Sequence, residues 1–488
     1  MENYLISVDM GGSKVVAALG LRSTEGQTIV VDTVVKPMEG FTRGEVTNIE
    51  HVTNAIRSAV EELTTRNGVE ASEVWVSASG KHIVCADNSG FVYVGGTDGE
   101  ITESDVESLH HNMNNVQAPE GKVILARIPQ NYKVDGNETI GSPVGRFGHR
   151  LETTFSFILG GKVVLERISK AFARAGIPNV HFVAGSCASA SVAATEEEKD
   201  SGVIVIDFGA GATDICIIQN NIVRYVASIP FGSAAINKDI RSTAIPVGTI
   251  EKLKTVCGYA TASAIPEEKL NKAVRINAHS SHQKHKEITY RDLTTIIESR
   301  MLDIIDFVNT EIKASGYHNR LPAGIIITGG GSKLAGIETL FRERTGYDVR
   351  LGSAESDISV ESIDGFSAPE LTTAIGLLNI GLAEMGTPAT EYSKPNAAQT
   401  HNEEQQTILV EKPEEQKVVR ITTPDNNPDN GPHNTPDNDG KVEKKEKTDK
   451  KRGKKEREEQ EQQTPRRGFL DKVKDFFFGT DVTDDELM

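Results

Sequence analysis

Three short segments far apart in this chain share one pattern, a β-branched run that breaks into glycines. They are ISVDMGGSK (6–14), VIVIDFGAGATDI (203–215) and IIITGGGSK (325–333). Continuous apolar runs of this length are typical of strands that are buried on both faces. Glycine directly after a strand permits a sharp turn and a close approach to phosphate, and successive N–H groups in such a turn bind anions. A single segment would fit an ordinary strand connection, but the three together predict the walls of one nucleotide pocket.

Two of these turns also carry an acidic residue at the last strand position, Asp9 and Asp207. A carboxylate there could hold Mg²⁺ mainly through water, because Mg²⁺ usually keeps several of its own water ligands. The signatures of P-loop and dinucleotide-binding proteins are both missing. Gly209 and Gly211 do form a GxG pair, but Asp207 before it and Asp214 after it indicate metal and phosphate chemistry.

Composition excludes several classes of protein. The formal net charge of −17 argues against a nucleic-acid partner, because general binding to nucleic acid requires a basic face. The hydrophobic share of 37% is low and suggests that part of the chain is unfolded. The four scattered cysteines are typical of reduced core residues in a cytosolic protein. The N-terminus lacks the pattern of a signal peptide and no run of about eighteen apolar residues occurs, so any membrane contact should be peripheral.

Residues 1–386 alternate strand-like and helix-like segments, which favours an α/β fold. Three strands, a helix over 49–68 and a returning strand form an order that recurs after residue 203. This repeat predicts two related halves with a cleft between them. Residues 80–160 depart from it, with a helix predicted over 101–116 and opened by a capping box from Thr102 to Asp105. We therefore expect a compact α+β insertion there.

The end of the chain has a different character. Residues 387–465 are rich in polar and charged residues and repeat TPDN, so we expect a disordered tether. The segment 466–479 follows it, and the acidic residues 480–488 end the chain. The apolar residues of 466–479 fall on one face of a helix with basic flanks, which suits a membrane interface. Docking on the folded body or in a protein groove is the alternative. The membrane-facing residues would be Phe469, Leu470, Val473, Phe476 and Phe477.

These features together resemble the actin-like ATPase superfamily and, within it, the FtsA family of bacterial division proteins. Matching stretches include VDMGGSKVVA, RGEVTNIE (43–50), IPQNYKVDG (128–136) and GSPVGRFGHRLE (141–152). The resemblance covers about 1–386 and 466–478. It implies an actin-like (ribonuclease H-like) two-half ATPase fold with an α+β insertion in the first half, then a disordered tail and a terminal amphipathic helix.

The expected domain boundaries follow from the repeat and from the resemblance. The first half would comprise 1–80, 161–202 and a closing helix at 367–386, with the insertion at 81–160. The second half would comprise 203–245 and 319–366, interrupted by an inserted subdomain at 246–318.

The resemblance also implies a site for ATP and Mg²⁺, built from two phosphate loops, an adenosine turn and a helix beside the ribose and adenine. The first phosphate loop would be formed by Asp9, Gly11, Gly12, Ser13 and Lys14. The second would be formed by Asp207, Gly209, Ala210, Gly211, Ala212, Thr213 and Asp214. The adenosine turn would contain Gly329, Gly330, Gly331 and Ser332, and the helix would contribute Glu251 and Lys254. The spacing of the last two places them on one helix face, which an ordinary surface ion pair would also show.

Three departures from the family pattern predict weak hydrolysis. Gly185 and Ser186 stand where relatives carry a water-orienting glutamate and a proline. Ala210 and Ala212 replace glycine and threonine in the second loop, and Gly12 stands where threonine is common. Because phosphoryl transfer depends mostly on positioning and electrostatics, losing the water-orienting group should remove most of the rate. We assign no catalytic residue and expect ATP to be bound and hydrolysed slowly or not at all.

The function implied is that of a division adaptor. Such a protein polymerises with itself, binds the C-terminal peptide of FtsZ and tethers FtsZ filaments to the cytoplasmic face of the inner membrane at the septum, early in divisome assembly. Other divisome proteins would bind at 81–160. Arg300 matches a basic family position implicated in the FtsZ contact, with a solvated helix charge as the alternative. A sugar-kinase-like phosphotransferase and a pilus-assembly actin-like ATPase are the competing hypotheses.

Overall fold

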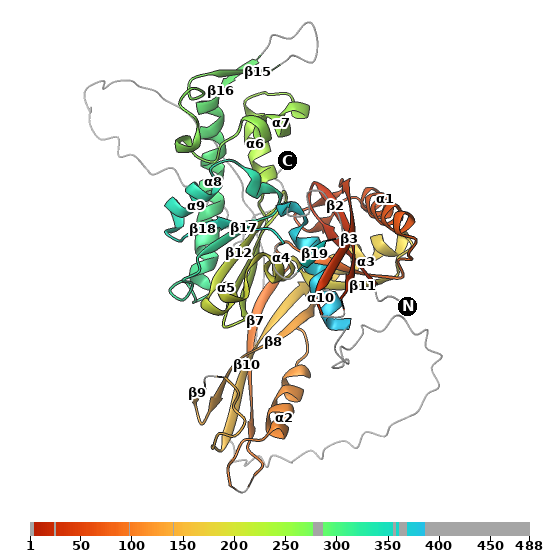
Figure 1. The fold of residues 1–488 in the computed structure, drawn as a ribbon, viewed down its shortest axis with the longest axis vertical. Helices are drawn as coiled ribbons and strands as arrows, with labels where there is room; N and C mark the ends of the chain where they lie inside the picture. Colours follow the sequence, from red (N-terminus) through yellow and green to blue (C-terminus); the bar gives the residue numbers. More distant parts are fainter. Residues whose placement is uncertain are drawn as a thin grey trace, which may run out of the picture. The chain divides into compact units, whose positions relative to one another are not determined.

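The computed structural model describes residues 4–23, 26–96, 98–139, 141–276, 286–354, 358–360 and 368–385 (Figure 1). All of them belong to one compact unit, Met1–Thr390. The expected tether (387–465), amphipathic helix (466–479) and acidic tail (480–488) lie outside the described residues, and so do the five apolar residues predicted to bind the membrane.

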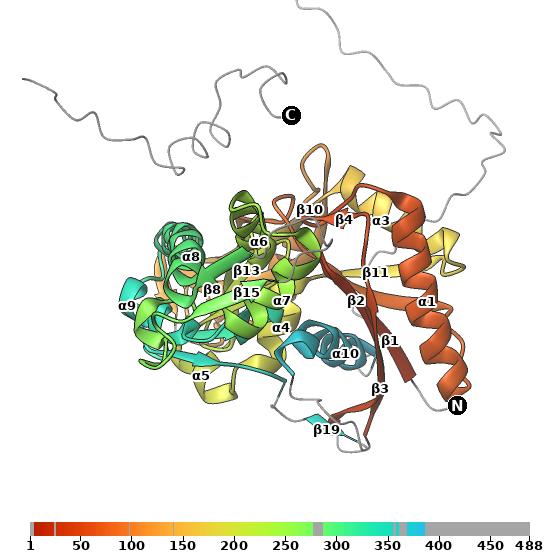
Figure 2. The same cartoon turned by 90° about the horizontal axis from the view of Figure 1, so that it is seen from above.

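The first half is built on a six-stranded sheet with the order β11-β6-β1-β2-β3-β19. Its strands are β1 (Tyr4–Met10), β2 (Lys14–Arg22), β3 (Thr28–Pro37), β6 (Glu73–Ala78), β11 (Asn179–Ala184) and β19 (Ile358–Val360). β1 to β3 form an antiparallel meander, and β1 pairs in parallel with β6. As Figure 2 shows, α1 (Ile49–Asn67) and α10 (Thr372–Met385) cover opposite faces of this sheet. α3 (Lys162–Arg174) packs beside α1, and α4 (Gly185–Ala193) packs against α10.

The second half repeats this arrangement in a five-stranded sheet with the order β14-β13-β12-β17-β18. Its strands are β12 (Val203–Phe208), β13 (Thr213–Gln219), β14 (Ile222–Ile229), β17 (Ile325–Thr328) and β18 (Val349–Leu351). β12 to β14 form an antiparallel meander, and β12 pairs in parallel with β17. The long helix α8 (Tyr290–Ala314) and α9 (Ile337–Thr345) share a core with this sheet. The predicted repeat of strands and helices is therefore confirmed.

Local sequence explains where the first helices begin and end. α1 starts where the side chain of Asn48 accepts hydrogen bonds from the N–H groups of Glu50 and His51, and it ends at Gly68, whose φ is 64°. α2 (Glu103–Asn114) starts with the predicted capping box between Thr102 and Asp105. Both helices lie where the sequence predicts them.

Two further parts extend the halves. The insertion is a four-stranded sheet with the order β7-β10-β8-β9, covered by α2. Its strands are β7 (Val84–Tyr93), β8 (Lys122–Val134), β9 (Asn137–Thr139) and β10 (Arg150–Gly161). The second half carries a subdomain made of α6 (Ser233–Ser242), α7 (Val247–Cys257), β15 (Ala273–Ile276), β16 (Lys286–Thr289) and the start of α8.

Several short elements connect these parts. They are β4 (Phe41–Thr42), β5 (Glu45–Val46), α5 (Glu196–Ser201), η1 (Ala262–Ala264), η2 (Gly330–Lys333) and η3 (Pro369–Leu371). Within the part of the chain that the structure describes, every helix is too short or too polar to cross a bilayer.

Candidate nucleotide site

The three glycine turns meet in the structure, and we call the region where they meet the three-turn site. β12 and β17 are parallel neighbours, which places Asp207 opposite Thr328 and brings the second and third turns together. Gly329 has a φ of 81° and packs so closely on Asp207 that a side chain there would collide with the carboxylate. The convergence predicted from the sequence therefore exists, and it depends on glycine at this turn.

The first and second turns come from opposite halves and also touch. A Cβ placed on Gly12 would lie 3.2 Å from the backbone nitrogen of Gly211. The first turn is closed by a hydrogen bond of 2.9 Å from the N–H of Gly11 to the carbonyl of Lys14, and the carbonyl of Ser13 accepts from Met38. Side chains at positions 12 and 211 would push the two halves apart.

Three carboxyl groups meet at this junction, the buried Asp214 and the half-buried Asp9 and Asp207, and hydroxyl groups hold them. Ser77 Oγ donates to Asp9 Oδ1 at 2.6 Å. The hydroxyls of Ser189 and Thr373 both donate to Asp207 Oδ2 at 2.6 Å. Sequence reasoning identified the acids but missed these hydroxyl residues, which come from β6, α4 and α10.

Burial and repulsion between neighbouring carboxylates disfavour the charged forms of Asp9 and Asp214. Burial raises the pKa of Asp9 to about 6, and the charge of Asp207 adds to the shift. Burial also raises the pKa of Asp214 to about 7, again with a contribution from Asp207, even though Ser228 and Ser79 donate hydrogen bonds to it. Both shifts follow the general rule that desolvation and a neighbouring like charge stabilise the neutral acid.

This arrangement suits a cation that is held through water. Bringing a cation between the three acids would relieve their mutual repulsion and lower the raised pKa values of Asp9 and Asp214. Among the residues that the structure describes, no group of three or more His, Cys, Asp or Glu side chains is arranged to hold a metal ion directly. Mg²⁺, which retains water ligands, is a cation that such a site could hold.

Lys14 lies on the other side of the site, near the third turn. A Cβ placed on Gly330 would lie 3.9 Å both from Lys14 Nζ and from Glu370 Cβ. The Glu370 carboxylate pairs with Lys333, and its buried Oε2 atom has no hydrogen-bond partner among the described residues. Burial lowers the pKa of Lys14, while the charges of Glu370 and Asp9 oppose that shift. Nothing in the sequence pattern indicated Glu370.

The second turn is tied to the start of α6. The N–H groups of Ser233 and Ala234 donate to the carbonyls of Gly209 and Ala210, both at 2.9 Å. The N–H of Gly209 bonds the carbonyl of Ala212 at 3.0 Å. The Thr213 hydroxyl donates to the carbonyl of Phe231 at 2.7 Å, so it stabilises the fold in this structure.

Glu251 and Lys254 form an ion pair of 2.9 Å on α7. The Lys254 side chain is only 7% exposed, unlike a lysine in an ordinary surface pair. Its Nζ also lies 3.4 Å from the carbonyl of Ser233, the residue that bonds the second turn. The pair is thereby connected to the three-turn site through α6.

The third turn is fixed internally. Gly330–Lys333 forms η2, and the buried Ser332 hydroxyl donates to the carbonyl of Gly329 at 2.7 Å. Gly331 packs against Phe208, the last residue of β12. The Ser332 side chain therefore maintains the turn.

Gly185 begins α4 close to the three-turn site. A Cβ placed on Gly185 would lie 2.6 Å from Ser79 Oγ. Ser79 also donates to Asp214. The position where the resemblance implied a glutamate is therefore packed against a serine hydroxyl.

Arg300 does not join this site. It lies on α8 and makes a two-pronged ion pair with Asp239 of α6, with distances of 2.6 Å from Nε and 2.9 Å from Nη2. Asp303 accepts a further bond of 3.0 Å from Nη1. The Arg300 side chain is only 19% exposed, so it forms a largely buried ion pair that joins α8 to α6.

The IPQNYKVDG stretch connects the insertion to the second half. Arg224 of β14 donates to Gln130 Oε1 at 2.9 Å and to Asn131 Oδ1 at 3.1 Å. These residues line a polar cavity of about 340 Å³ between the insertion and the second half. The structure thus gives this motif a role in joining two parts of the fold.

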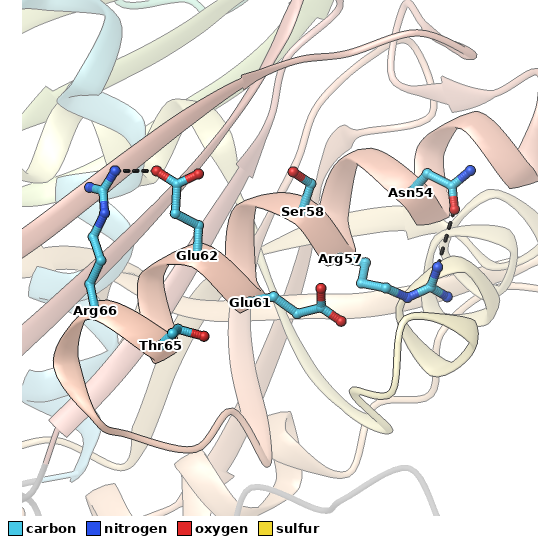
Figure 3. A pocket seen from close by; sticks show the side chains of 7 residues that line it. All are labelled: Asn54, Arg57, Ser58, Glu61, Glu62, Thr65 and Arg66. Atoms are coloured by element: carbon cyan, nitrogen blue, oxygen red, sulfur yellow. Dashed lines mark hydrogen bonds and ion pairs between the residues drawn. The ribbon is translucent and has the colours of Figure 1, made fainter.

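A second hollow lies along α1 and is separate from the glycine turns (Figure 3). It is an open helix face, crossed by an ion pair between Arg66 and Glu62 and a hydrogen bond of 3.1 Å from Arg57 to Asn54. Ser58, Glu61 and Thr65 complete its lining. Its residues are ordinary surface groups of the helix.

Comparisons with known proteins agree with this geometry. A family model described as "Cell division protein FtsA" matches residues 204–376, and one described as "SHS2 domain inserted in FTSA" matches residues 80–159. FtsA of Neisseria meningitidis serogroup B is 30% identical over 380 residues, covering 78% of this chain and 90% of that protein. FtsA of Pseudomonas aeruginosa is 30% identical over 380 residues, covering 78% and 89%.

Among solved structures, a PilM–PilN type IV pilus biogenesis complex aligns with a TM-score of 0.53 at 14% identity, covering 78% of this chain and 98% of that chain. At this identity the likeness concerns the fold alone. The architecture is the expected actin-like one, with two related α/β halves and an insertion in the first. The chain belongs to the FtsA family of cell division proteins.

Proposed function

We propose that this chain is a division adaptor that binds ATP with Mg²⁺ at the three-turn site. The observation that carries the proposal is the meeting of three glycine turns around Asp9, Asp207 and Asp214. Serine hydroxyl groups donate hydrogen bonds to these three carboxyl groups. A cation with a polyphosphate supplies what these groups lack, and the glycine turns supply the N–H donors. Adenosine would lie along the third turn, near Lys254.

The bound ATP would act mainly as a structural ligand. Gly185 provides no side chain to orient a water, and Ser79 fills the adjoining space. Removing a group that positions the nucleophile lowers the rate of a reaction that depends on positioning. We therefore propose slow or absent hydrolysis, with ATP favouring a conformation that polymerises.

The partners proposed are those of the family. A self-assembled filament would bind the C-terminal peptide of FtsZ through 246–318 and other divisome proteins through 81–160. The segment 466–479 would hold the filament on the cytoplasmic face of the inner membrane at the septum. Many weak anchors along one filament give an avidity that one anchor lacks. The net charge of −17 supports the absence of a nucleic-acid partner.

A contact between Arg300 and the FtsZ peptide would require an exchange of ion pairs. Asp239 and Asp303 already bind the guanidinium, so an acidic peptide would have to displace one of them or add to the cluster. Such an exchange favours binding only if the peptide carboxylate replaces the lost bond.

The anchor is tested by sedimentation with liposomes made from bacterial polar lipids. The full chain should pellet with liposomes and should carry FtsZ with it, whereas a truncation at 465 should remain in the supernatant. Phe469→Glu with Phe476→Glu should behave like the truncation, because it places charge on the apolar face, and Asp475→Asn is the matched control off that face. Equal pelleting of the full chain and the truncation would contradict the anchor.

The fold likeness to the PilM–PilN complex keeps a pilus-assembly ATPase as the second candidate, and a sugar-kinase-like phosphotransferase would share the phosphate turns. A kinase would show ATP turnover that rises strongly when a hexose is added. Sedimentation of FtsZ together with the full chain and the liposomes would favour the division adaptor.

A further inference from the structure

Arg43 lies where the two phosphate turns face each other. It occupies the tight connection between β4 and β5, in the first half. A Cβ placed on Gly211 would lie 3.1 Å from the Arg43 backbone nitrogen, and the same glycine touches Gly12. The connection therefore contacts the second phosphate turn directly, although it belongs to the opposite half.

The backbone of Arg43 is held in an uncommon conformation. Its φ is 54°, in the left-handed region that is unfavourable for a residue other than glycine. Gly44 and Gly80 pack against Ser79 and Arg43 so closely that neither could carry a side chain. A strained residue persists only where the surrounding structure determines it, and this often marks a binding site.

The side chain of Arg43 reaches across to the second half. Its guanidinium carbon lies 5.2 Å from the centre of the Phe231 ring. The Phe231 carbonyl accepts the hydroxyl of Thr213 from the second turn, and its ring stacks on Phe307 of α8 with 5.8 Å between centroids. Within the described residues, the Arg43 guanidinium makes this aromatic contact and no hydrogen bond or ion pair.

Lys14 and Arg43 therefore face different parts of the site. Lys14 lies beside Gly330 and Glu370, at the third turn, where adenosine is proposed to bind. Arg43 lies beside Gly211 of the second phosphate turn, where the far end of a polyphosphate would sit. A guanidinium presents several N–H donors in a planar fork and binds phosphate oxygens in a two-pronged manner.

We propose that Arg43 binds the terminal phosphate of ATP, a contact that ADP cannot make. The inference rests on the proposed binding of ATP at the three-turn site. It goes further by assigning a residue of the first half that distinguishes a triphosphate from a diphosphate and fastens the two halves together across the nucleotide.

The test is calorimetric binding of Mg·ADP and of the Mg²⁺ complex of a β,γ-imido ATP analogue to the full chain. Arg43→Gly is the cleanest deletion, because glycine adopts the observed φ without strain. It should weaken binding of the triphosphate about tenfold and change binding of ADP less than about twofold. Arg43→Lys should be intermediate. Arg57→Ala, which removes a half-buried arginine of α1 that bonds the Arg174 carbonyl, is the matched control and should bind both nucleotides as wild type does.

The possible outcomes separate this inference from the function on which it rests. If wild type binds both nucleotides and Arg43→Gly binds both as tightly as wild type, the inference is overturned and ATP binding stands. An equal loss for both nucleotides, with an unchanged melting temperature, also overturns it, because it excludes a contact to the terminal phosphate. If wild type binds neither nucleotide, the proposed function itself fails.

Discussion

The three-turn site and the Arg300 ion pair both place charged groups inside the fold, but they neutralise them differently. In the three-turn site, the carboxyl groups of Asp9 and Asp207 are held by hydroxyls. Around Arg300, Asp239 and Asp303 are held by a guanidinium from a neighbouring helix. The charges around Arg300 are balanced within the chain. The three-turn site leaves negative charge for something outside the chain to balance.

This difference separates stability from binding. A buried charge without a counter-charge lowers the stability of the free protein, and its pKa moves toward the neutral form. The pKa values of Asp9 and Asp214 are raised in this way by burial and by the charge of Asp207. A paired charge such as Arg300 instead penalises the fold when its partner is removed. The following predictions test the two halves of this comparison.

The largest effect is expected for Asp214→Asn without nucleotide or Mg²⁺. The pKa of Asp214 is raised from 3.8 to about 7, so the folded state binds a proton between these values that the unfolded state does not. Stability from this group is therefore present below pH 4 and is lost as the pH rises through 7. At pH 8 the variant should be more stable than wild type by up to about 4 kcal/mol, and near pH 4 the two should match.

Urea denaturation over this pH range provides the measurement. Asp98→Asn, at an exposed position of the insertion, is the matched control and should leave the pH dependence unchanged. If the Asp214→Asn variant were less stable than wild type at pH 8, Asp214 would not be an acid whose charge lacks a counter-charge and destabilises the fold.

Arg300→Ala should have the opposite sign and a smaller size. Removing the guanidinium leaves Asp239 and Asp303 facing each other, and we expect a loss of about 1–3 kcal/mol in the free energy of unfolding. The double variant with Asp239→Asn should recover part of that loss. Chemical denaturation measures both, and an Arg300→Ala protein as stable as wild type would show that the pair contributes nothing to the fold.

The same double variant separates structure from recognition. If Arg300 acts on the FtsZ peptide directly, peptide binding should stay weak in the double variant even though stability recovers. Recovery of both would assign Arg300 a purely structural role.

The smallest effect is expected at Glu370, which is paired with a lysine like Asp239 with Arg300 but lies beside the three-turn site. Its carboxylate pairs with Lys333 and its charge also acts on Lys14. Glu370→Gln should remove a negative charge beside the proposed nucleotide and tighten ATP binding by about two- to fivefold, the size typical of a partly exposed pair. A titration with a fluorescent ATP analogue measures it, and weaker binding would indicate that Glu370 positions Lys14 correctly.

The sequence was informative wherever the signal is local. Buried apolar runs followed by glycine predicted the three turns, and the pattern around Thr102 predicted the start of α2. The hydroxyl donors were not predictable, because Ser77 and Thr373 lie 68 and 166 positions from the acids they hold. Serine and threonine are common in every kind of segment, so only the tertiary fold identifies these two.

The contacts of charged residues with partners far away in the sequence were equally unpredictable. Asp239 pairs with Arg300 from 61 positions away, and no spacing rule connects them. Arg43 stands in a stretch that the family resemblance noted, yet its contact with Phe231 exists only once the two halves come together. Sequence periodicity therefore predicts elements and turns, whereas long-range charge pairing requires the structure.

The central claim is that the three-turn site binds ATP together with Mg²⁺, and calorimetry on the full chain tests it most directly. ATP should bind more tightly with Mg²⁺ than with EDTA, and Asp207→Asn should weaken Mg·ATP binding at least about tenfold, as is typical when a group that holds a metal's ligands is removed. Equal affinity with and without Mg²⁺, together with unchanged binding in Asp207→Asn, would contradict the account.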